Sequence, residues 1–172
     1  MTAVRASCFS TFFLLLALAI SLTAATAQGD PAVLLGGRSG VNAPTALELS
    51  PGPLVGADVT LRLKSLWAVE FVLEHGWHGP VSLTQGALGL QYRIDVTLVV
   101  PYLTLAAEAQ RLARRGRPPV FGYGGALAGG VLVPFGERWF WGAEARYGIS
   151  LQGEFPVRQT FLLRIGWRSH GI

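Results

Sequence analysis

The sequence contains a single cysteine, Cys8, among its 172 residues, and only 14% of its residues are charged. Cys8 lies inside the N-terminal apolar segment and not before a cleavage site, so it lacks the placement of a lipidated cysteine. Without another cysteine, the rest of the chain has no disulfide, no cysteine-based metal site and no cysteine nucleophile. The low charge and a mean hydropathy of +0.42 exclude a disordered chain, and they are unusual for a soluble domain, where about 25% charged is typical.

After residue 27 the sequence also lacks a segment typical of a transmembrane helix. The best candidate, Val120–Phe135, is uncharged but shorter than the roughly 18 residues usually needed, and it is rich in glycine. Leu103–Arg115 has a helix-forming composition, but its first half alternates between apolar and polar residues and predicts a strand. The net charge of +4 is modest and comes largely from Arg111–Arg117. We therefore expect no nucleic-acid partner.

The first 27 residues have the pattern of a secretory signal peptide. Arg5 is followed by the apolar run Phe12–Ile20 and then by the small-residue step Ala25–Ala27, directly before Gln28. An uncleaved anchor helix is the alternative, and the Ala-x-Ala step favours cleavage. We predict a signal peptide over residues 1–27 and one domain over residues 28–172.

The rest of the chain alternates with a period of two residues. Val59 and Leu61 share one face of a predicted strand, while Asp58, Thr60 and Arg62 share the other. Successive side chains of a strand point to opposite faces, so each such segment has one oily and one polar face. In the four segments that carry several charges, the charges always have the same parity. This regularity predicts strands with one face in a polar environment and one in an apolar environment.

Six clear segments and two weaker ones, Ala32–Val41 and Val120–Val133, give eight predicted strands. The connections between them are predicted to be alternately short and long. The short ones are Ser65-Leu66, the region of Asp95-Val96, and Pro134–Arg138, and the long ones are Asn42–Pro53, Gly76–Ser82, Arg111–Pro119 and Gln152–Val157. Tight turns at one end and longer loops at the other are typical of outer-membrane barrels. We therefore predict an all-β, eight-stranded antiparallel up-and-down transmembrane β-barrel.

The aromatic residues are predicted to form two girdles on the outward face. Those expected near the periplasmic ends of their strands are Trp67, Tyr92, Trp139, Trp141 and Trp167, and those expected near the opposite rim are Phe121, Tyr123, Tyr147 and Phe161. Trp and Tyr favour the membrane–water interface, because the ring is apolar and its N–H or O–H group needs a polar partner. The alternative is a secreted soluble barrel that carries an apolar ligand and turns its oily face inward.

Gly-aromatic segments such as Phe121–Gly125 and Leu163–Trp167 complete the pattern. With them the chain, from about Ala32 to Trp167, resembles the small outer-membrane β-barrel superfamily of OmpA-, OmpX- and OmpW-like proteins, without indicating a subfamily. The resemblance implies a bacterial outer membrane, export through the signal peptide, and insertion by the barrel-assembly machinery. Such proteins usually end on an aromatic residue that this machinery reads, whereas this chain continues past Trp167 to Ile172.

The polar face of the predicted strands would fill the interior of the barrel. An eight-stranded barrel has an interior just wide enough for side chains, and an unpaired buried charge is costly. Five acidic and six basic residues therefore predict a lumen plugged by ion pairs, with a gated ion or solute path as the alternative. They are Asp58, Arg62, Lys64, Glu70, Glu74, Arg93, Glu108, Glu144, Arg146, Arg164 and Arg168.

One predicted outer loop is basic. Arg111, Arg114, Arg115 and Arg117 precede Pro118-Pro119, and arginine binds phosphate through two parallel hydrogen bonds. We hypothesise a contact with phosphate groups of outer-membrane lipid, including lipopolysaccharide. A solvated loop is the alternative.

Some eight-stranded barrels are lipid A deacylases or acyltransferases, and such a deacylase needs a serine nucleophile, a histidine base and an acidic residue that orients the base. Glu74, His75, His78 and Ser82 are the candidates for an acid, a base and a nucleophile, but the adjacent His-Ser motif expected in the deacylase family is absent. In a strand, Glu74, His75 and His78 would not share a face, which argues against a metal site. We predict a non-catalytic protein without metal or cofactor, and keep a lipid A-modifying hydrolase as the alternative.

Overall fold

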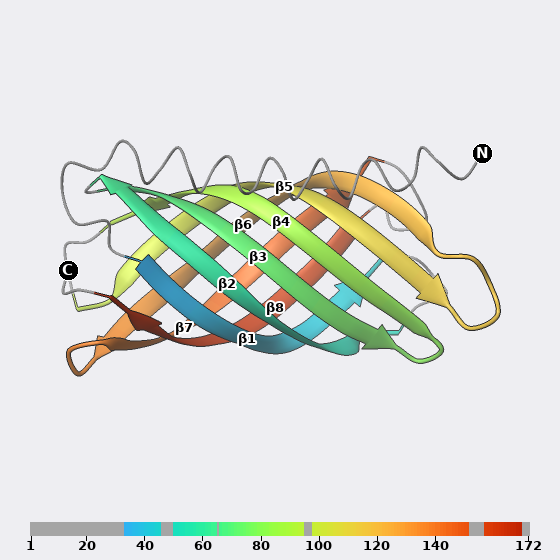
Figure 1. Ribbon diagram of the computed structural model, residues 1–172, viewed down its shortest axis with the longest axis horizontal. Coiled ribbons are helices and arrows are strands. Elements are labelled where there is room, and N and C mark those ends of the chain that lie inside the picture. Colours follow the sequence, from blue (N-terminus) through green and yellow to red (C-terminus); the bar gives the residue numbers. More distant parts are fainter. Residues whose placement is uncertain (1–32, 46–49, 65, 95–97, 152–156, 170–172) are drawn as a thin grey trace. The chain divides into compact units, whose positions relative to one another are not determined.

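The computed structural model describes residues 33–45, 50–64, 66–94, 98–151 and 157–169. The predicted signal peptide and its cleavage site lie outside these residues. Eight strands follow in chain order: β1 (Val33–Pro44), β2 (Gly52–Lys64), β3 (Trp67–His78), β4 (Val81–Arg93), β5 (Val100–Arg114), β6 (Val120–Phe135), β7 (Trp139–Ser150) and β8 (Val157–Arg168). Each strand pairs antiparallel with the next, and β8 pairs with β1, so the sheet closes into a barrel (Figure 1). The predicted eight-stranded antiparallel barrel is confirmed.

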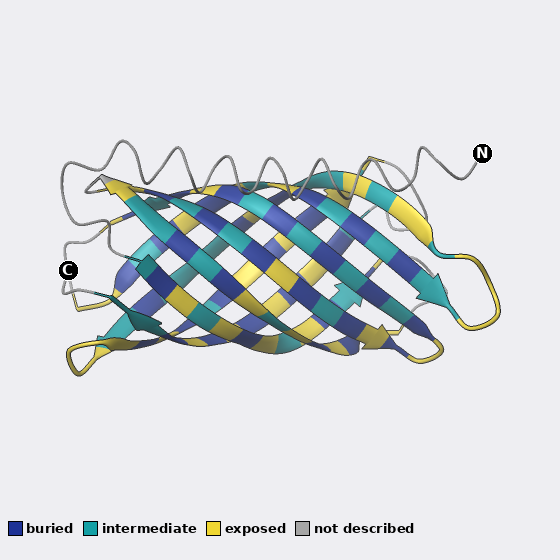
Figure 2. Cartoon of the chain, viewed as in Figure 1, coloured by how far each residue is buried: buried dark blue, intermediate teal, exposed yellow. Residues whose placement is uncertain are grey.

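Burial alternates along the strands, as the banding in Figure 2 shows. On β5, Leu103 and Leu105 are 59% and 70% exposed, whereas Thr104 between them is 3% exposed. The same contrast recurs on β8, where Leu163 is exposed and Arg164 is buried. The oily face therefore points outward and the polar face inward. The alternative of a soluble barrel with its oily face inward is wrong.

The stagger of the strands sets the width of the interior. Starting from Arg38, the pairing leads through β2, β3 and β4 to Gln110 of β5, and through β8, β7 and β6 to Val100 of β5. The two paths meet β5 ten residues apart. Strand number and stagger together fix the diameter of a barrel, and eight strands leave room for side chains but not for a wide channel.

The connections differ in length from the prediction. The connection predicted as the long loop Gly76–Ser82 contains only Gly79-Pro80, because the ladder continues to the pair His78–Val81. Gly79 has a φ of +64°, which glycine adopts without strain and which suits a tight turn. The connection from β4 to β5, predicted to be short, spans residues 94–99. Strict alternation of short and long connections is therefore wrong, although the order of the strands is unaffected.

The two weaker strands extend further than predicted. β1 continues to Pro44 and β6 to Phe135, since over their last residues β1 still pairs with β8 and β6 with β7. Among the described residues, no helix is long and apolar enough to cross a membrane.

Candidate functional site

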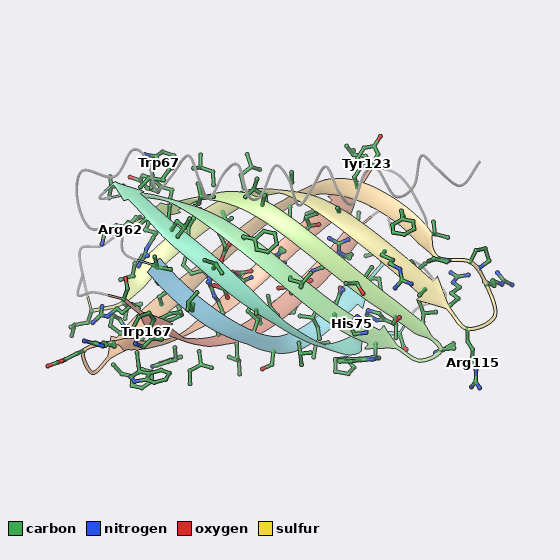
Figure 3. The ribbon with its side chains drawn as sticks, viewed as in Figure 1. Arg62, Trp67, His75, Arg115, Tyr123 and Trp167 are labelled. Atoms are coloured by element: carbon green, nitrogen blue, oxygen red, sulfur yellow. The ribbon has the colours of Figure 1, made fainter. Side chains whose placement is uncertain are left out.

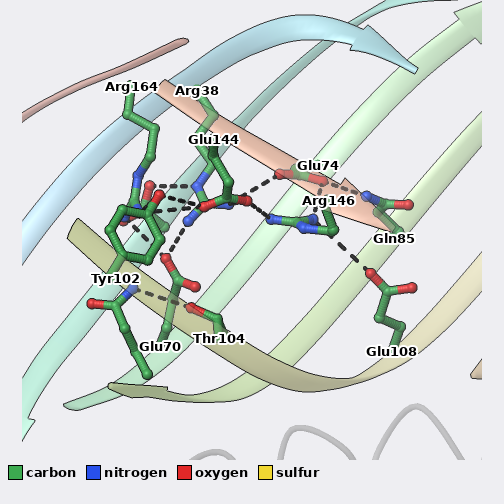
Figure 4. Close-up of polar contacts among 12 residues, drawn as sticks. Arg38, Glu70, Glu74, Gln85, Tyr102, Thr104, Glu108, Glu144, Arg146 and Arg164 are labelled. Atoms are coloured by element: carbon green, nitrogen blue, oxygen red, sulfur yellow. Dashed lines mark hydrogen bonds and ion pairs between the residues drawn. The ribbon is translucent and has the colours of Figure 1, made fainter. Parts of the chain in front are cut away.

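A buried arginine, Arg38, lies at the centre of the lumen. Its Nε donates to Asp58 Oδ1 at 2.7 Å, its Nη1 to Glu144 Oε1 at 3.1 Å and to Glu74 Oε1 at 3.5 Å, and its Nη2 to Glu70. The side chain has no exposed surface. One guanidinium group thus contacts four carboxylates from three strands, β2, β3 and β7 (Figure 4).

A second arginine and a tyrosine make further polar contacts with three of these carboxylates. Arg164 contacts Asp58 through Nη2, and its Nη2 lies 3.0 Å from Glu70 Oε1. Its Nη1 donates to the hydroxyl of Tyr102 at 2.8 Å, and that hydroxyl donates to Glu144 Oε2 at 2.7 Å. Asp58, Glu70 and Glu144 therefore each accept from Arg38 and from a second buried group.

Arg146 carries this network toward the end of the barrel where β7 ends. Its Nη1 lies 2.9 Å from Glu74 Oε2 and 4.0 Å from Glu108 Oε1, and its Nη2 lies 2.7 Å from Glu144 Oε1. Gln85 donates to the same oxygen of Glu74. We call the group that these contacts join the central cluster: Arg38, Asp58, Glu70, Glu74, Tyr102, Glu144, Arg146 and Arg164.

Apolar side chains fill the lumen on the side where β1 begins and β8 ends. They are the buried cluster Leu34, Val100, Tyr102, Leu132 and Phe140. The ring of Tyr102 belongs to this cluster, while its hydroxyl belongs to the central cluster. The low dielectric beside these side chains strengthens the ionic contacts and makes any broken contact more costly.

A different polar region lies on the other side of the central cluster. Arg158 of β8, which is 1% exposed, reaches across the lumen to Glu108 of β5. Together with their buried polar neighbours they form what we call the outer polar layer: Asn42, Gln85, Glu108, Gln110 and Arg158. Beyond it, toward the rim, Val81, Leu83 and Leu112 form a buried apolar cluster.

Most but not all of the residues predicted for the lumen lie within it. Asp58, Glu70, Glu74, Glu108, Glu144, Arg146 and Arg164 lie in the contacts just described, and Arg93 is buried as well. Arg62 is half-buried, and the side chain of Lys64 is outside the described part. Arg168 was wrongly included, because it donates to the backbone carbonyls of Glu137 and Gly136 in the turn before β7.

The lumen residues that the sequence analysis missed include Arg38, Tyr102 and Arg158. Arg38 is the one charged residue of a glycine-rich strand, so charge parity had nothing to compare. Arg158 lies just after a predicted loop, before the first residue assigned to the strand. Tyr102 shares the parity of Thr104 and Glu108, and this signal was available in the sequence.

The predicted girdle residues lie on the outward face at the end where β8 ends. Trp67 and Tyr92 are cross-strand partners whose ring centroids are 5.0 Å apart. Trp139 pairs with Trp167, and Trp141 lies two residues further along β7. Figure 3 places Trp67 and Trp167 at this end, and Tyr123 at the opposite end with His75 and Arg115.

At that opposite end the exposed aromatic residues are Trp77, Phe121, Tyr123 and Tyr147, together with Phe161 lower on β8. Trp77 was not among those predicted.

The predicted basic cluster does not form one surface. Arg111 lies on β5 and faces outward, beside Thr84 of β4 and Phe121 of β6. Arg114, the last residue of β5, has the opposite parity, and Arg115 and Arg117 are exposed in the turn that follows. The assignment of all four arginines to one loop is therefore wrong.

The candidate catalytic residues are not brought together either. Glu74 and His78 face the lumen, and His78 Nδ1 lies 3.0 Å from the carbonyl oxygen of Ser50. His75 faces outward, where its Nδ1 is 2.9 Å from Thr84 Oγ1, and Ser82 pairs with Trp77 instead. In the described ranges, no group of three His, Cys, Asp or Glu residues could hold a metal ion.

The fold is that of small outer-membrane barrels of known structure. The chain is 16% identical to the N-terminal β-barrel domain of OprF from Pseudomonas aeruginosa, with a TM-score of 0.65 over 82% of this chain and 99% of that one. It is 19% identical to Neisserial surface protein A, with a TM-score of 0.61 over 81% and 96%. Ail of Yersinia pestis matches at 11% identity and a TM-score of 0.55 over 83% and 99%. No family model and no curated protein matches the sequence.

Proposed function

We propose that this chain, which has the fold of the small eight-stranded outer-membrane barrels, is a non-catalytic protein of the bacterial outer membrane whose lumen is sealed by the central cluster. Arg38 and its four carboxylates carry this proposal. Its function then depends on the outer rim and on the lipid-facing wall. Insertion by the barrel-assembly machinery remains a prediction from the family resemblance.

The energetics of buried charge favour a closed lumen. Opening a path through the middle of the barrel would require Arg38 and Arg164 to leave their carboxylates. Removing one partner from a buried ion pair typically costs about 3–5 kcal/mol, because the remaining charge is left uncompensated. With several such contacts in one cluster, spontaneous opening is expected to be rare.

Conductance across a planar lipid bilayer tests the seal. The refolded wild-type barrel is expected to add no ion current above that of the bare membrane. Arg38→Ala, which removes the central cation, is expected to produce measurable openings, whereas Arg115→Gln at the rim is expected to produce none. Discrete openings of the wild-type protein at the same frequency as in Arg38→Ala would contradict the proposal.

The rim supports contact with phosphorylated lipid of the outer leaflet. Arg111 faces outward at the level of Thr84 and His75, in a polar row on the wall near the outer end of β3, β4 and β5. Arg115 and Arg117 are exposed nearby in the turn, and arginine forks match phosphate geometry. One solved structure of Ail, a protein of the same fold, contains the heparin analogue sucrose octasulfate, an anionic sugar derivative.

Co-sedimentation with lipid vesicles tests this contact. The wild-type protein in detergent is expected to bind vesicles containing lipopolysaccharide more tightly than vesicles containing its dephosphorylated form. The triple variant R111Q/R115Q/R117Q is expected to lose that preference. An unchanged preference would assign the arginines to a solvated rim.

A lipid A hydrolase is the alternative, and the outward-facing pair of His75 and Thr84 is the feature to examine. We propose that the pair is not catalytic, since among the described residues no carboxylate contacts His75. Lipid A composition is expected to be the same in cells that overexpress the wild type, His75→Ala or Ser82→Ala. A modified lipid A that disappears with His75→Ala would establish the enzyme instead.

A further inference from the structure

The outer polar layer contains a buried arginine with unused hydrogen-bond donors. Arg158 is 1% exposed, and only its Nη2 has a partner, Glu108. Its Nε and Nη1 have no hydrogen-bond partner in the described part of the chain. A guanidinium group has five N–H donors, and leaving donors of a buried charge unsatisfied is costly. The position therefore requires a further acceptor.

Two buried amides belong to the same layer as this arginine. Asn42 pairs with Thr160 and Pro44 with Arg158, so Asn42 and Arg158 are diagonal neighbours on the lumen face of β1 and β8. Gln110 lies two residues after Glu108 and shares its face. Neither amide atom of Asn42 has a partner among the residues described, and neither does Nε2 of Gln110.

The unused atoms in this layer are mostly donors. They are Nε and Nη1 of Arg158, Nδ2 of Asn42 and Nε2 of Gln110, against the acceptors Oδ1 of Asn42, Oε1 of Gln85 and Oε1 of Glu108. The last of these acceptors lies 4.0 Å from Arg146 and is thus already opposite a cation. A positively charged group surrounded by amide N–H donors favours an anion, and a planar fork favours a carboxylate or another oxyanion.

The backbone opposite Arg158 is also shaped for this arrangement. A Cβ at Gly148 would lie 2.7 Å from Nη2 of Arg158 and 3.2 Å from Oε2 of Glu108. Glycine at this position leaves the guanidinium group the space it occupies. A larger residue at position 148 would crowd the contact of Arg158 with Glu108.

We infer that the outer polar layer is a binding site for a small oxyanion such as a carboxylate, held by Arg158 with Asn42 and Gln110. It borders the central cluster through Gln85 and Glu108, but every carboxylate of that cluster already has cationic partners. It is separate from the arginines of the outer rim, because Arg158 points into the lumen. The test of this site involves neither conductance nor vesicle binding. Its outcome is therefore independent of the proposed seal and of the proposed lipid contact.

Isothermal titration of the refolded full chain with sodium formate, at ionic strength held constant with the sodium salt of a bulky sulfonate, tests the site. Saturable binding of one formate per chain is expected. The loss of a charge-assisted hydrogen bond should weaken binding by about tenfold or more in Arg158→Gln. Arg138→Gln, which changes an exposed arginine in the turn before β7, is expected to bind as the wild type does. Equal affinity in Arg158→Gln, or no saturable binding by the folded wild type, would overturn the inference.

A second measurement needs no variant, in case Arg158→Gln does not fold. Crystals of the wild type grown with sodium bromide are expected to show an anomalous peak within hydrogen-bond distance of Arg158 and Asn42. A halide serves here as a heavy small anion at the same donors. Ordered water alone at these atoms would overturn the inference and would explain the unused donors as a hydrated layer.

Discussion

Arg38 and Arg158 are both fully buried arginines in the same lumen, yet their surroundings differ. Arg38 contacts four carboxylates, and every carboxylate around it has at least one further partner. Arg158 contacts only Glu108 and keeps two nitrogen atoms without a partner in the described chain. In the central cluster only Nε of Arg164 lacks a partner among the described residues, whereas the outer polar layer has several such atoms. Similar chemistry can thus close one part of a lumen and leave another part able to bind.

Removal of the central arginine should have the largest effect. Arg38→Ala leaves four buried carboxylates without their shared cation, and we expect a loss of about 3–5 kcal/mol in the free energy of unfolding. Arg158→Ala removes the partner of one carboxylate and is expected to cost less. Urea titrations of the folded barrel in detergent, followed by gel mobility without boiling, measure both. Equal losses would contradict the distinction between the two regions.

Tyr102→Phe tests the central cluster without changing its charge. The substitution keeps the ring in the apolar cluster but removes a hydroxyl that accepts from Arg164 and donates to Glu144. A loss of about 2 kcal/mol is expected, because two buried charged groups each lose a hydrogen bond. The same titration measures it, with Tyr147→Phe on the exposed face as the control. A loss no larger than that of the control would show that the hydroxyl is replaceable.

Gly148→Ala tests the wall of the outer polar layer. The added methyl group would crowd the contact of Arg158 with Glu108, and a loss of about 1 kcal/mol is expected from the displacement. Gly125→Ala on the neighbouring strand is the matched control, because its Cβ would meet only the carbonyl oxygen of Ala106 at 3.5 Å. Equal stability of Gly148→Ala and Gly125→Ala would mean that Arg158 shifts away from the added methyl group without cost.

The smallest effect is expected at the rim. Arg111→Gln changes an outward-facing arginine whose cross-strand partners, Thr84 and Phe121, are uncharged. The free energy of unfolding in detergent should therefore change by no more than about 0.5 kcal/mol. The urea midpoint again provides the measurement. A loss near that of Tyr102→Phe would reveal a structural role for Arg111 and weaken its assignment to lipid contact.

The fold was predictable because its physical cause repeats along the chain. Each clear strand carries apolar residues at alternate positions, and charges such as Asp58 and Glu70 lie on the other parity, so the inward face was evident before any pairing was known. Turn lengths were less predictable. Gly79-Pro80 was absorbed into the predicted loop Gly76–Ser82, although Gly76, Trp77 and His78 lie within the ladder of β3.

The lumen contacts were less predictable, because parity gives a face but not a position around the barrel. The stagger brings Arg38 of β1 next to Glu144 of β7, and no local pattern relates these two residues. Arg158 meets Glu108 across the barrel for the same reason. The division of Arg111 and Arg114 between two faces did follow from parity, but the prediction that both lie in a loop concealed it.

The pairing of β1 with β8 has a consequence for how the chain assembles. This contact joins Leu34 to Arg168, nearly the full length of the domain apart, so its loop-closure entropy is lost only when the two ends meet. The contacts of Arg38 with Glu144 and of Asp58 with Arg164 also bridge these two ends of the chain. They form only once the circle is complete. The central charges therefore stabilise the barrel only after the last step of folding. A variant that weakens them is expected to unfold faster rather than to fold more slowly.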